Sequence, residues 1–156
     1  MADVHTTEQR ARNMRAVRSR NTDPEITVRK ILFASGFRFR LHVRTLPGVP
    51  DIVLPKHRAV IFVHGCFWHG HDCHLFKIPQ TRTDFWMGKI AGNRERDLRH
   101  GALLRSAGWR VMTVWECAVR GRLRHAPDEV GDILSAWLTV GQGGAAADEL
   151  RHRPDL

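Results

Sequence analysis

The sequence predicts a single α/β domain in which helices cover the faces of a central sheet. Short apolar runs of strand length alternate with longer segments of helical periodicity, which is the pattern of an α/β fold. The chain has 156 residues, 42% of them apolar, and this suits one hydrophobic core. We place the domain at residues 1–140, with a basic arm or helix at 1–20, and expect residues 141–156 to form a disordered tail.

The first predicted helix begins at Thr22. Thr22 and Glu25 have the spacing of a capping box, and Pro24 fits a first helical turn, where its missing N–H is not needed. Gly36 can end this helix in a left-handed conformation. Residues 37–43 then alternate between apolar and polar side chains, which predicts a half-exposed strand.

The later elements follow from apolar runs and from turn residues. A tight turn around Pro55 separates two strands, and a long charged helix starts after a cap at Thr83-Asp84. Between them, residues 65–83 show no periodicity, and we predict a loop that a metal ion orders. The expected elements are strands at 51–54, 59–63 and 109–115 and helices at 85–107 and 130–138.

The charge of the chain favours a nucleic-acid partner. The formal net charge is +9, and only four of the 25 basic residues are lysines. Arginine forks suit phosphate groups and guanine edges, so a basic surface of this kind attracts nucleic acid. The alternative is that the arginines reflect the codon composition of a GC-rich genome.

The sequence has no feature of a membrane or secreted protein. No apolar run approaches the roughly 18 residues that cross a bilayer, and the N-terminus has no signal-peptide pattern. We therefore expect a soluble, cytoplasmic protein. Its three cysteines cannot all form disulfides, and a reducing compartment favours a metal site over a crosslink.

Four residues form a candidate zinc site, which is of the Cys₃His type. Cys66, His71 and Cys73 lie within eight residues, and Cys117 follows a later strand that could return beside them. Four protein ligands leave no open position, so such a site is structural. The alternative is that the cysteines are small buried apolar residues and His71 lies on the surface.

Candidate catalytic residues lie where two predicted strands begin and end. Asp51 opens a strand directly after a turn, where a carboxylate is a good magnesium ligand, although turn-forming aspartates are also common. His64 follows the next strand, and its imidazole could transfer a proton near neutral pH. Glu25 is a candidate second acid, but it could equally serve only the capping box.

Three aromatic residues do not fit a core. Phe67 and Trp68 are adjacent and would point in opposite directions from a strand, while Trp86 starts a charged helix. Large apolar side chains near a basic surface can insert between base pairs and bend a duplex. Core packing remains an alternative for Trp86, and strand or helix periodicity assigns three other tryptophans to the core: Trp109, Trp115 and Trp137.

These residues belong to a longer string of motifs. It comprises VIFVHGCFWH at 60–69, His71 and Cys73, LFK at 75–77, TRT at 81–83, Phe85-Trp86, GWRV at 108–111 and WEC at 115–117. NMRA at 13–16 and Pro47-Gly48 with Pro50-Asp51 extend the match. This string closely resembles the very-short-patch-repair (Vsr) mismatch endonucleases, and the resemblance covers residues 1–122.

The resemblance implies a restriction-endonuclease-like fold with a central mixed sheet, flanking helices and a structural zinc. It also implies a magnesium-dependent enzyme that nicks duplex DNA 5′ to the thymine of a T:G mismatch left by 5-methylcytosine deamination. Asp51 becomes the magnesium ligand together with the backbone carbonyl of Val63, a position where family members often carry threonine. His69 becomes the general base, with His64 and Glu25 supporting the hydrated metal and the phosphate.

The resemblance assigns the zinc to Cys66, His71, Cys73 and Cys117. It makes Phe67, Trp68 and Trp86 an intercalating wedge beside the mismatch, with further DNA contacts from Met14, Arg15, Val17 and Lys89. Gly70 and Asp72 interrupt what can be a run of histidines, so neither position is an essential ligand. We expect a monomer that acts on mismatched double-stranded DNA, with other repair proteins as further partners.

Two other readings of the sequence stay open. A zinc-ordered DNA-binding protein without catalysis explains the charge and the ligand set, but not Asp51 with His64 and His69. A nuclease of the same fold with another DNA substrate is the second alternative, although the aromatic residues favour a distorted duplex. A purely structural RNA-binding role ranks last.

Overall fold

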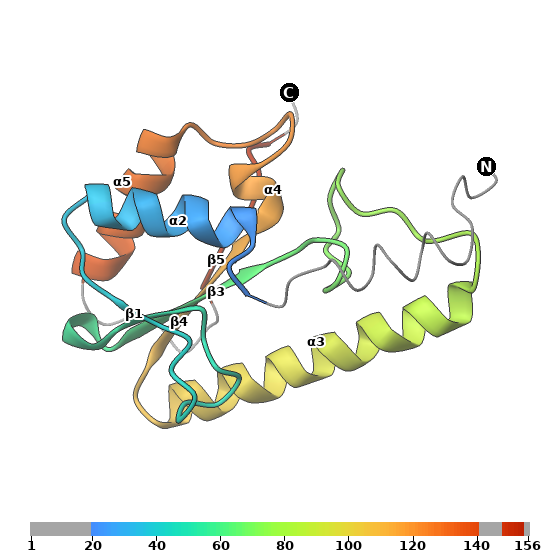
Figure 1. The fold of residues 1–156 in the computed structure, drawn as a ribbon, viewed down its shortest axis with the longest axis horizontal. Helices are drawn as coiled ribbons and strands as arrows, with labels where there is room; N and C mark the ends of the chain where they lie inside the picture. Colours follow the sequence, from blue (N-terminus) through green and yellow to red (C-terminus); the bar gives the residue numbers. More distant parts are fainter. Residues whose placement is uncertain (1–19, 141–147, 155–156) are drawn as a thin grey trace.

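The computed structural model describes residues 20–140 and 148–154, which form a five-stranded sheet between two layers of helices (Figure 1). The strands lie side by side in chain order: β1 (Arg40–Leu41), β2 (Ile52–Leu54), β3 (Ala59–His64), β4 (Arg110–Trp115) and β5 (Asp148–Leu150). Strands β1 to β3 pair antiparallel, whereas β3, β4 and β5 pair parallel. The sheet is therefore mixed, as predicted.

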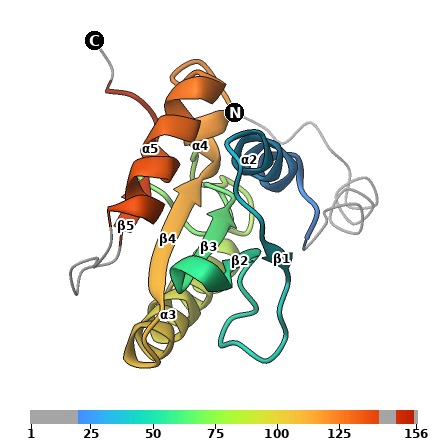
Figure 2. The same cartoon turned by 90° about the vertical axis from the view of Figure 1, so that its left-hand side faces the viewer.

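Helices cover both faces of the sheet, which confirms the predicted α/β class. One face carries α2 (Asp23–Ala34), α4 (Glu116–Val119) and α5 (Pro127–Thr139), and the other carries α3 (Thr83–Ser106), as Figure 2 shows. Leu32 of α2 and Leu134 of α5 are fully buried in the larger core. Leu104 of α3 is fully buried in a smaller core on the opposite face, against Val60 and Val111.

The start of α2 follows the predicted capping box with one change. Thr22 is the N-cap, and its Oγ1 accepts a hydrogen bond from the Glu25 N–H at 3.4 Å. The Glu25 carboxylate reaches back to the N–H of Asn21 at 3.0 Å, one residue before the N-cap. Gly36 follows the helix with φ +94°, the left-handed conformation expected there.

Strand β1 is much shorter than the alternation at 37–43 predicted. Only Arg40 and Leu41 pair with β2. His42 has φ +48°, which takes the backbone out of the extended region and ends the strand. Phe37 and Phe39 still pack against the core, so the alternation reflected burial rather than strand length.

Helix α3 starts without the predicted cap. The N-cap is Arg82, in a left-handed conformation with φ +54°, and no side chain caps the helix. Thr83 already belongs to the helix, and its hydroxyl donates to the Pro79 carbonyl at 2.7 Å. At 24 residues α3 is long but highly charged. Within residues 20–140 and 148–154, no helix combines the length and the apolar character needed to cross a membrane.

The prediction of a disordered tail is wrong for residues 148–154. Residues 148–150 form β5, and the Trp137 Nε1–H donates to the Asp148 carboxylate at 2.6 Å. The Arg151 guanidinium then donates to the Asp72 carbonyl at 2.8 Å. Side-chain contacts from remote elements thus order this segment. Residues 141–147 and 155–156, and the predicted arm apart from Arg20, lie outside the described residues.

The larger core supports a stability prediction on α5. We expect Leu134→Ala to lower the free energy of unfolding by about 2–5 kcal/mol, because a fully buried leucine leaves a cavity. Ile133 is the matched control on the same helix, since it is 38% exposed, and Ile133→Ala should cost less than about 1 kcal/mol. Urea unfolding of both variants measures the difference, and equal losses would contradict this packing.

Candidate active site and metal centre

Three groups of polar residues gather at one end of the sheet. Strands β3 and β4 run parallel, so their carboxyl ends meet at the same edge, where His64 lies opposite Trp115. Strand β2 runs the other way and pairs Ile52 with Ile61, which brings the residue before it, Asp51, beside the end of β3. Asp51, at the start of one predicted strand, and Val63 and His64, at the end of the next, therefore lie close together.

The first group consists of Glu25, His42 and Asp51. The Asp51 Oδ2 accepts a hydrogen bond from the Val63 N–H at 2.7 Å. The His42 Nε2 lies 3.2 Å from the Glu25 Oε2 and 3.9 Å from the Asp51 Oδ1. One ligand atom from each residue lies within 4.8 Å of the others, so the group could hold a metal ion.

Burial of two carboxyl groups controls the electrostatics of this group. Burial and the negative charge of Glu25 together raise the pKa of Asp51 to about 8, against the opposing effect of the hydrogen bond from the Val63 N–H. The Arg29 guanidinium lies 2.8 Å from the Glu25 Oε2 and compensates part of the charge. Two crowded, buried carboxyl groups of this kind fit a divalent cation, which takes oxygen ligands and favours their ionised form.

The second group consists of His64, His69 and Asp97. The two imidazole rings are stacked, with centroids 3.9 Å apart and an interplanar angle of 4°. The His69 Nδ1 hydrogen-bonds to the Asp97 Oδ2, and the His64 Nε2 lies 3.9 Å from the Asp97 Oδ1.

Burial and the neighbouring charges set the protonation of this second group. Burial and the proximity of His69 together lower the pKa of His64 to about 3, although Asp97 opposes the shift. His64 is therefore neutral at pH 7. Burial tends to raise the pKa of Asp97, but the hydrogen bond with His69 and the electrostatic interactions with the neighbouring imidazoles lower it overall. Asp97 is therefore an anion beside His69.

The third group brings together the four predicted zinc ligands, Cys66, His71, Cys73 and Cys117. The Cys66 and Cys117 Sγ atoms each lie 3.6 Å from the His71 Nδ1. Tetrahedral zinc with usual bond lengths separates a sulfur and a nitrogen ligand by about 3.6 Å. All four donor atoms lie within 4.8 Å of one another, and the three cysteines are free thiols. The donor set and its spacing fit a metal ion.

The thiols also interact as a crowded set of acids. A hydrogen bond with Cys117, together with burial, raises the pKa of Cys66. The same hydrogen bond lowers the pKa of Cys117 to about 6. Cys117 therefore loses its proton readily, whereas Cys66 and Cys73 keep theirs to higher pH. A bound divalent cation would favour the thiolate form of all three.

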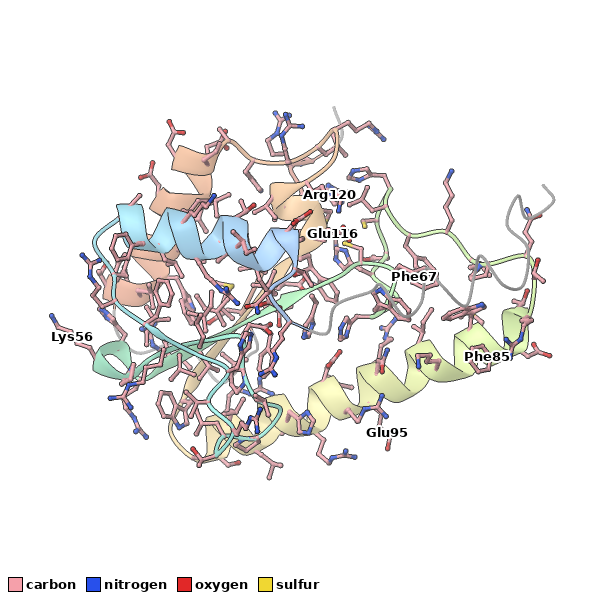
Figure 3. All side chains as sticks on the ribbon, viewed as in Figure 1. Lys56, Phe67, Phe85, Glu95, Glu116 and Arg120 are labelled. Carbon is pink, nitrogen blue, oxygen red and sulfur yellow. The ribbon has the colours of Figure 1, made fainter. Side chains whose placement is uncertain are left out.

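The three aromatic residues that did not fit a core do lie together. Phe67, Trp68 and Trp86 make mutual edge-to-face contacts, with ring centroids 5.2–5.8 Å apart. Each is half-buried, and Figure 3 shows Phe67 on the segment that leaves the end of β3, on the side of α3 opposite Glu95. The prediction that Trp115 belongs to the core is wrong, because its ring stacks on His71 with centroids 4.0 Å apart.

A wide cleft of about 1640 Å³ connects these groups. Carboxylates, histidines and the two aromatics of the β3–α3 segment line its interior, and seven basic residues contribute to its walls. The basic residues are Arg20, Arg44, Lys89, Arg94, Arg96, Arg105 and Arg120. Lys89, predicted to contact DNA, is an exposed residue of this wall. The basic residues of the walls can attract a polyanion, and the carboxylates of the interior can hold a cation that contacts it.

Sequence reasoning missed two members of these groups. His42 was predicted only as a polar residue of the alternating strand at 37–43. Because the next strand begins at Asp51 after a turn, an antiparallel pairing of the two strands would have placed His42 near this predicted site residue. Asp97 is one of many charged residues in α3, but it lies eleven residues, or three helical turns, after Trp86 and so shares its face. Three predicted DNA contacts lie outside the described residues: Met14, Arg15 and Val17.

The chain is similar to known DNA mismatch endonucleases and nicking enzymes. Residues 2–75 match the family described as DNA mismatch endonuclease Vsr. The chain is 47% identical over 146 residues to the DNA mismatch endonuclease Vsr of Escherichia coli K12, which covers 94% of this chain and 93% of that protein. It is 50% identical over 134 residues to the type II nicking enzyme V.XorIIP of Xanthomonas oryzae pv. oryzae, covering 82% and 98% of the two chains.

A third relative extends the comparison to another nicking enzyme. The chain is 45% identical over 140 residues to V.NmeAIP of Neisseria meningitidis serogroup A, which covers 86% of this chain and 100% of that one. Identity at this level over nearly the whole chain includes the segments that carry all three polar groups. The chain belongs to the Vsr family of DNA mismatch endonucleases.

Proposed function

We propose that this endonuclease nicks one strand of duplex DNA 5′ to the thymine of a T:G mismatch and depends on magnesium for this activity. The observation that carries the proposal is the convergence of Asp51 with the His64–His69–Asp97 group in one basic cleft. Hydrolysis of a phosphodiester needs a cation, a base for the attacking water and stabilisation of the leaving oxygen. The alternative of a DNA-binding protein without catalysis does not agree with membership of an endonuclease family.

Asp51 and the backbone of Val63 would hold the magnesium ion. Bound magnesium supplies Lewis-acid polarisation of the phosphate. The Val63 N–H fixes the Asp51 Oδ2, which leaves the Oδ1 as the free ligand oxygen. Glu25, held by Arg29 and the Asn21 N–H, keeps a second negative charge beside this oxygen and would bind the waters of the hydrated cation.

His69 is the proposed general base. Its Nδ1 is engaged with the Asp97 carboxylate, which leaves the Nε2 as the proton acceptor. The Asp97 charge also stabilises the imidazolium that forms when His69 takes a proton from water. His64 is neutral because of its low pKa, so it would act by hydrogen bonding to the phosphate or to bound water and not as a cationic acid.

The proposed structural metal is zinc, bound by Cys66, His71, Cys73 and Cys117. Two of these ligands flank Phe67, Trp68 and His69 in the chain, so the zinc would order the loop that carries the base and part of the wedge. Phe67, Trp68 and Trp86 would insert beside the mismatch, where unstacking and unpairing the bases costs less free energy than in matched duplex. Lys89 would contact a phosphate from α3.

The first test compares duplexes that differ only in one base pair. With magnesium, we expect the protein to nick a T:G duplex on the thymine strand at least about 100-fold faster than the matched C:G duplex, and not to nick without the cation. Asp51→Asn should lower the nicking rate by about 1000-fold or more while DNA binding stays within threefold, since it removes the ligand charge. Asp132→Asn, at an exposed position of α5, is the matched control.

Gel analysis of end-labelled strands measures the rates in that comparison. Equal nicking of T:G and C:G duplexes would overturn the proposed substrate. An active Asp51→Asn protein would overturn the assignment of the cation ligand and leave the substrate assignment intact.

The second prediction concerns the zinc. Elemental analysis should find about one zinc per chain in the natural protein and close to none in Cys117→Ser, because three remaining ligands bind zinc far more weakly. We expect Cys117→Ser to lose nicking and several degrees of melting temperature. His57→Gln, which removes a histidine far from the ligands, should keep both the zinc and the activity. A Cys117→Ser protein with full zinc content would contradict the ligand set.

The third prediction follows from the raised pKa of Asp51. The folded-state pKa of about 8 lies above the unfolded value of 3.8, so Asp51 contributes stability that is present in acid and is lost as the pH rises toward 8. Without added magnesium, the melting temperature of the natural protein should therefore fall relative to Asp51→Asn between pH 5 and 8. The opposite contribution of His64 is common to both proteins and cancels.

Added magnesium should reverse this loss, because the cation competes with the proton on Asp51. The rise in melting temperature with magnesium should be larger at pH 8 than at pH 6 and absent in Asp51→Asn. Differential scanning fluorimetry across this pH range measures both effects. A constant difference between the two proteins would show that Asp51 is ionised throughout.

A further inference from the structure

His42 has a backbone conformation that side chains rarely adopt. Its φ of +48° lies in the left-handed region, directly after β1 ends. Its N–H donates to the Asp51 carbonyl at 3.4 Å, which ties the residue to the start of β2. Non-glycine residues held in this region tend to cluster at functional sites, because the surrounding structure must hold them there. The conformation of His42 therefore needs an explanation beyond the turn itself.

The side chain of His42 lies between the two carboxylates of the first group. The imidazole is 12% exposed, and its Nε2 is 3.2 Å from the Glu25 Oε2 and 3.9 Å from the Asp51 Oδ1. Adjacent ligands of an octahedral cation with bonds of about 2.1 Å are about 3 Å apart, and opposite ligands are about 4.2 Å apart. Both distances from the His42 Nε2 lie within this range, and all three donor atoms lie within 4.8 Å of one another, so they could share one cation.

A simpler role, as a hydrogen-bond donor to Glu25, leaves this arrangement unexplained. The Glu25 Oε2 already accepts hydrogen bonds from the Asn21 N–H at 3.0 Å and from Arg29 at 2.8 Å. Arg29 also supplies a positive charge beside Glu25, so a third donor is not needed to compensate the carboxylate.

Of the other imidazoles that line this cleft, those of His64 and His69 lie near the reaction end and share a carboxylate partner. The His69 Nδ1 hydrogen-bonds to Asp97, and the His64 Nε2 lies 3.9 Å from the same carboxylate. Among the described residues, His42 is the imidazole that belongs to the group of Asp51.

We propose that His42 is a ligand of the cation held by Asp51, which makes this a mixed nitrogen and oxygen site that binds manganese more tightly than magnesium. Magnesium prefers oxygen ligands and retains its water, whereas divalent transition metals accept imidazole nitrogen. The inference rests on the proposed function only in taking Asp51 as a ligand of the cation. It adds a ligand and a metal preference to that site.

Pulsed electron paramagnetic resonance tests the proposal without any nicking assay. The full-length protein, with zinc bound, is given Mn²⁺ below one equivalent, and the coupling of the Mn²⁺ electron spin to a nitrogen nucleus is recorded. We expect nitrogen coupling in the natural protein and none in His42→Gln, whose amide can still hydrogen-bond to Glu25. His57→Gln is the matched control and should keep the coupling, because η1 (Pro55–His57) lies at the end of the molecule away from Phe67, where Figure 3 labels Lys56.

Affinities for the two cations give a second, independent measurement. His42→Gln should weaken Mn²⁺ binding by about tenfold or more and change Mg²⁺ binding by less than about threefold, since only the transition metal gains much from the nitrogen. Free Mn²⁺ is measured by its own resonance signal, and Mg²⁺ by competition against Mn²⁺.

Three results would overturn the proposal. They are an absence of nitrogen coupling in the natural protein, coupling that persists in His42→Gln, and equal losses of Mn²⁺ and Mg²⁺ affinity. The spectrum of the natural protein decides the first point even if His42→Gln does not fold. Because no result depends on cleavage, a protein that shows the coupling but does not discriminate T:G from C:G would refute the proposed function and leave this inference standing.

Discussion

The parallel pairing of β3 with β4 is the constraint on which the whole functional end of the molecule depends. It sets His64 opposite Trp115. Two residues after each of these positions lies a cysteine of the candidate metal centre, Cys66 after β3 and Cys117 after β4. Parallel strands that end at the same edge of a sheet place the segments after them side by side, so one register brings His64 and the thiols to one place. A shift of this register by one residue would turn every side chain to the other face of the sheet and separate both sets.

The same end of the sheet concentrates groups that a fold without function would avoid. Glu25 and Asp51 are crowded carboxyl groups with little exposure, and their repulsion raises the pKa of Asp51. The thiols of the metal centre are a second crowded set of acids, in which the pKa of Cys66 is raised and that of Cys117 is lowered. Burial of like charges destabilises the protein unless a proton or a cation binds, so the apolar layers under α2 and α5 must offset this cost when the groups are ionised.

Local signals in the sequence predicted most of the fold and the ligands. The capping box of α2, the apolar run of β3 and the spacing of the cysteines each act over a few residues, and each is found in the structure. What the sequence could not predict depends on contacts between distant segments. Strand β5 forms because Trp137 and β4 bind a segment that is polar by itself, and Asp97 is selected from the many charges of α3 by the position of His69. His42 was missed because the alternating pattern predicts an extended backbone, whereas the residue has a left-handed conformation that the sequence does not signal.

Helix α3 joins the aromatic cluster to the His64–His69–Asp97 group through one rigid element. Trp86 contacts Trp68 near the start of the helix, and Asp97 holds His69 three turns later, about 16 Å along the axis. Between them, the Asn93 amide donates to the Trp68 carbonyl at 2.8 Å. Trp68 and His69 are neighbours in the chain, so the helix holds both by separate side chains. The Asn93–Trp68 and Asp97–His69 hydrogen bonds therefore fix the position of the aromatic cluster relative to the imidazole, because both start from one helix.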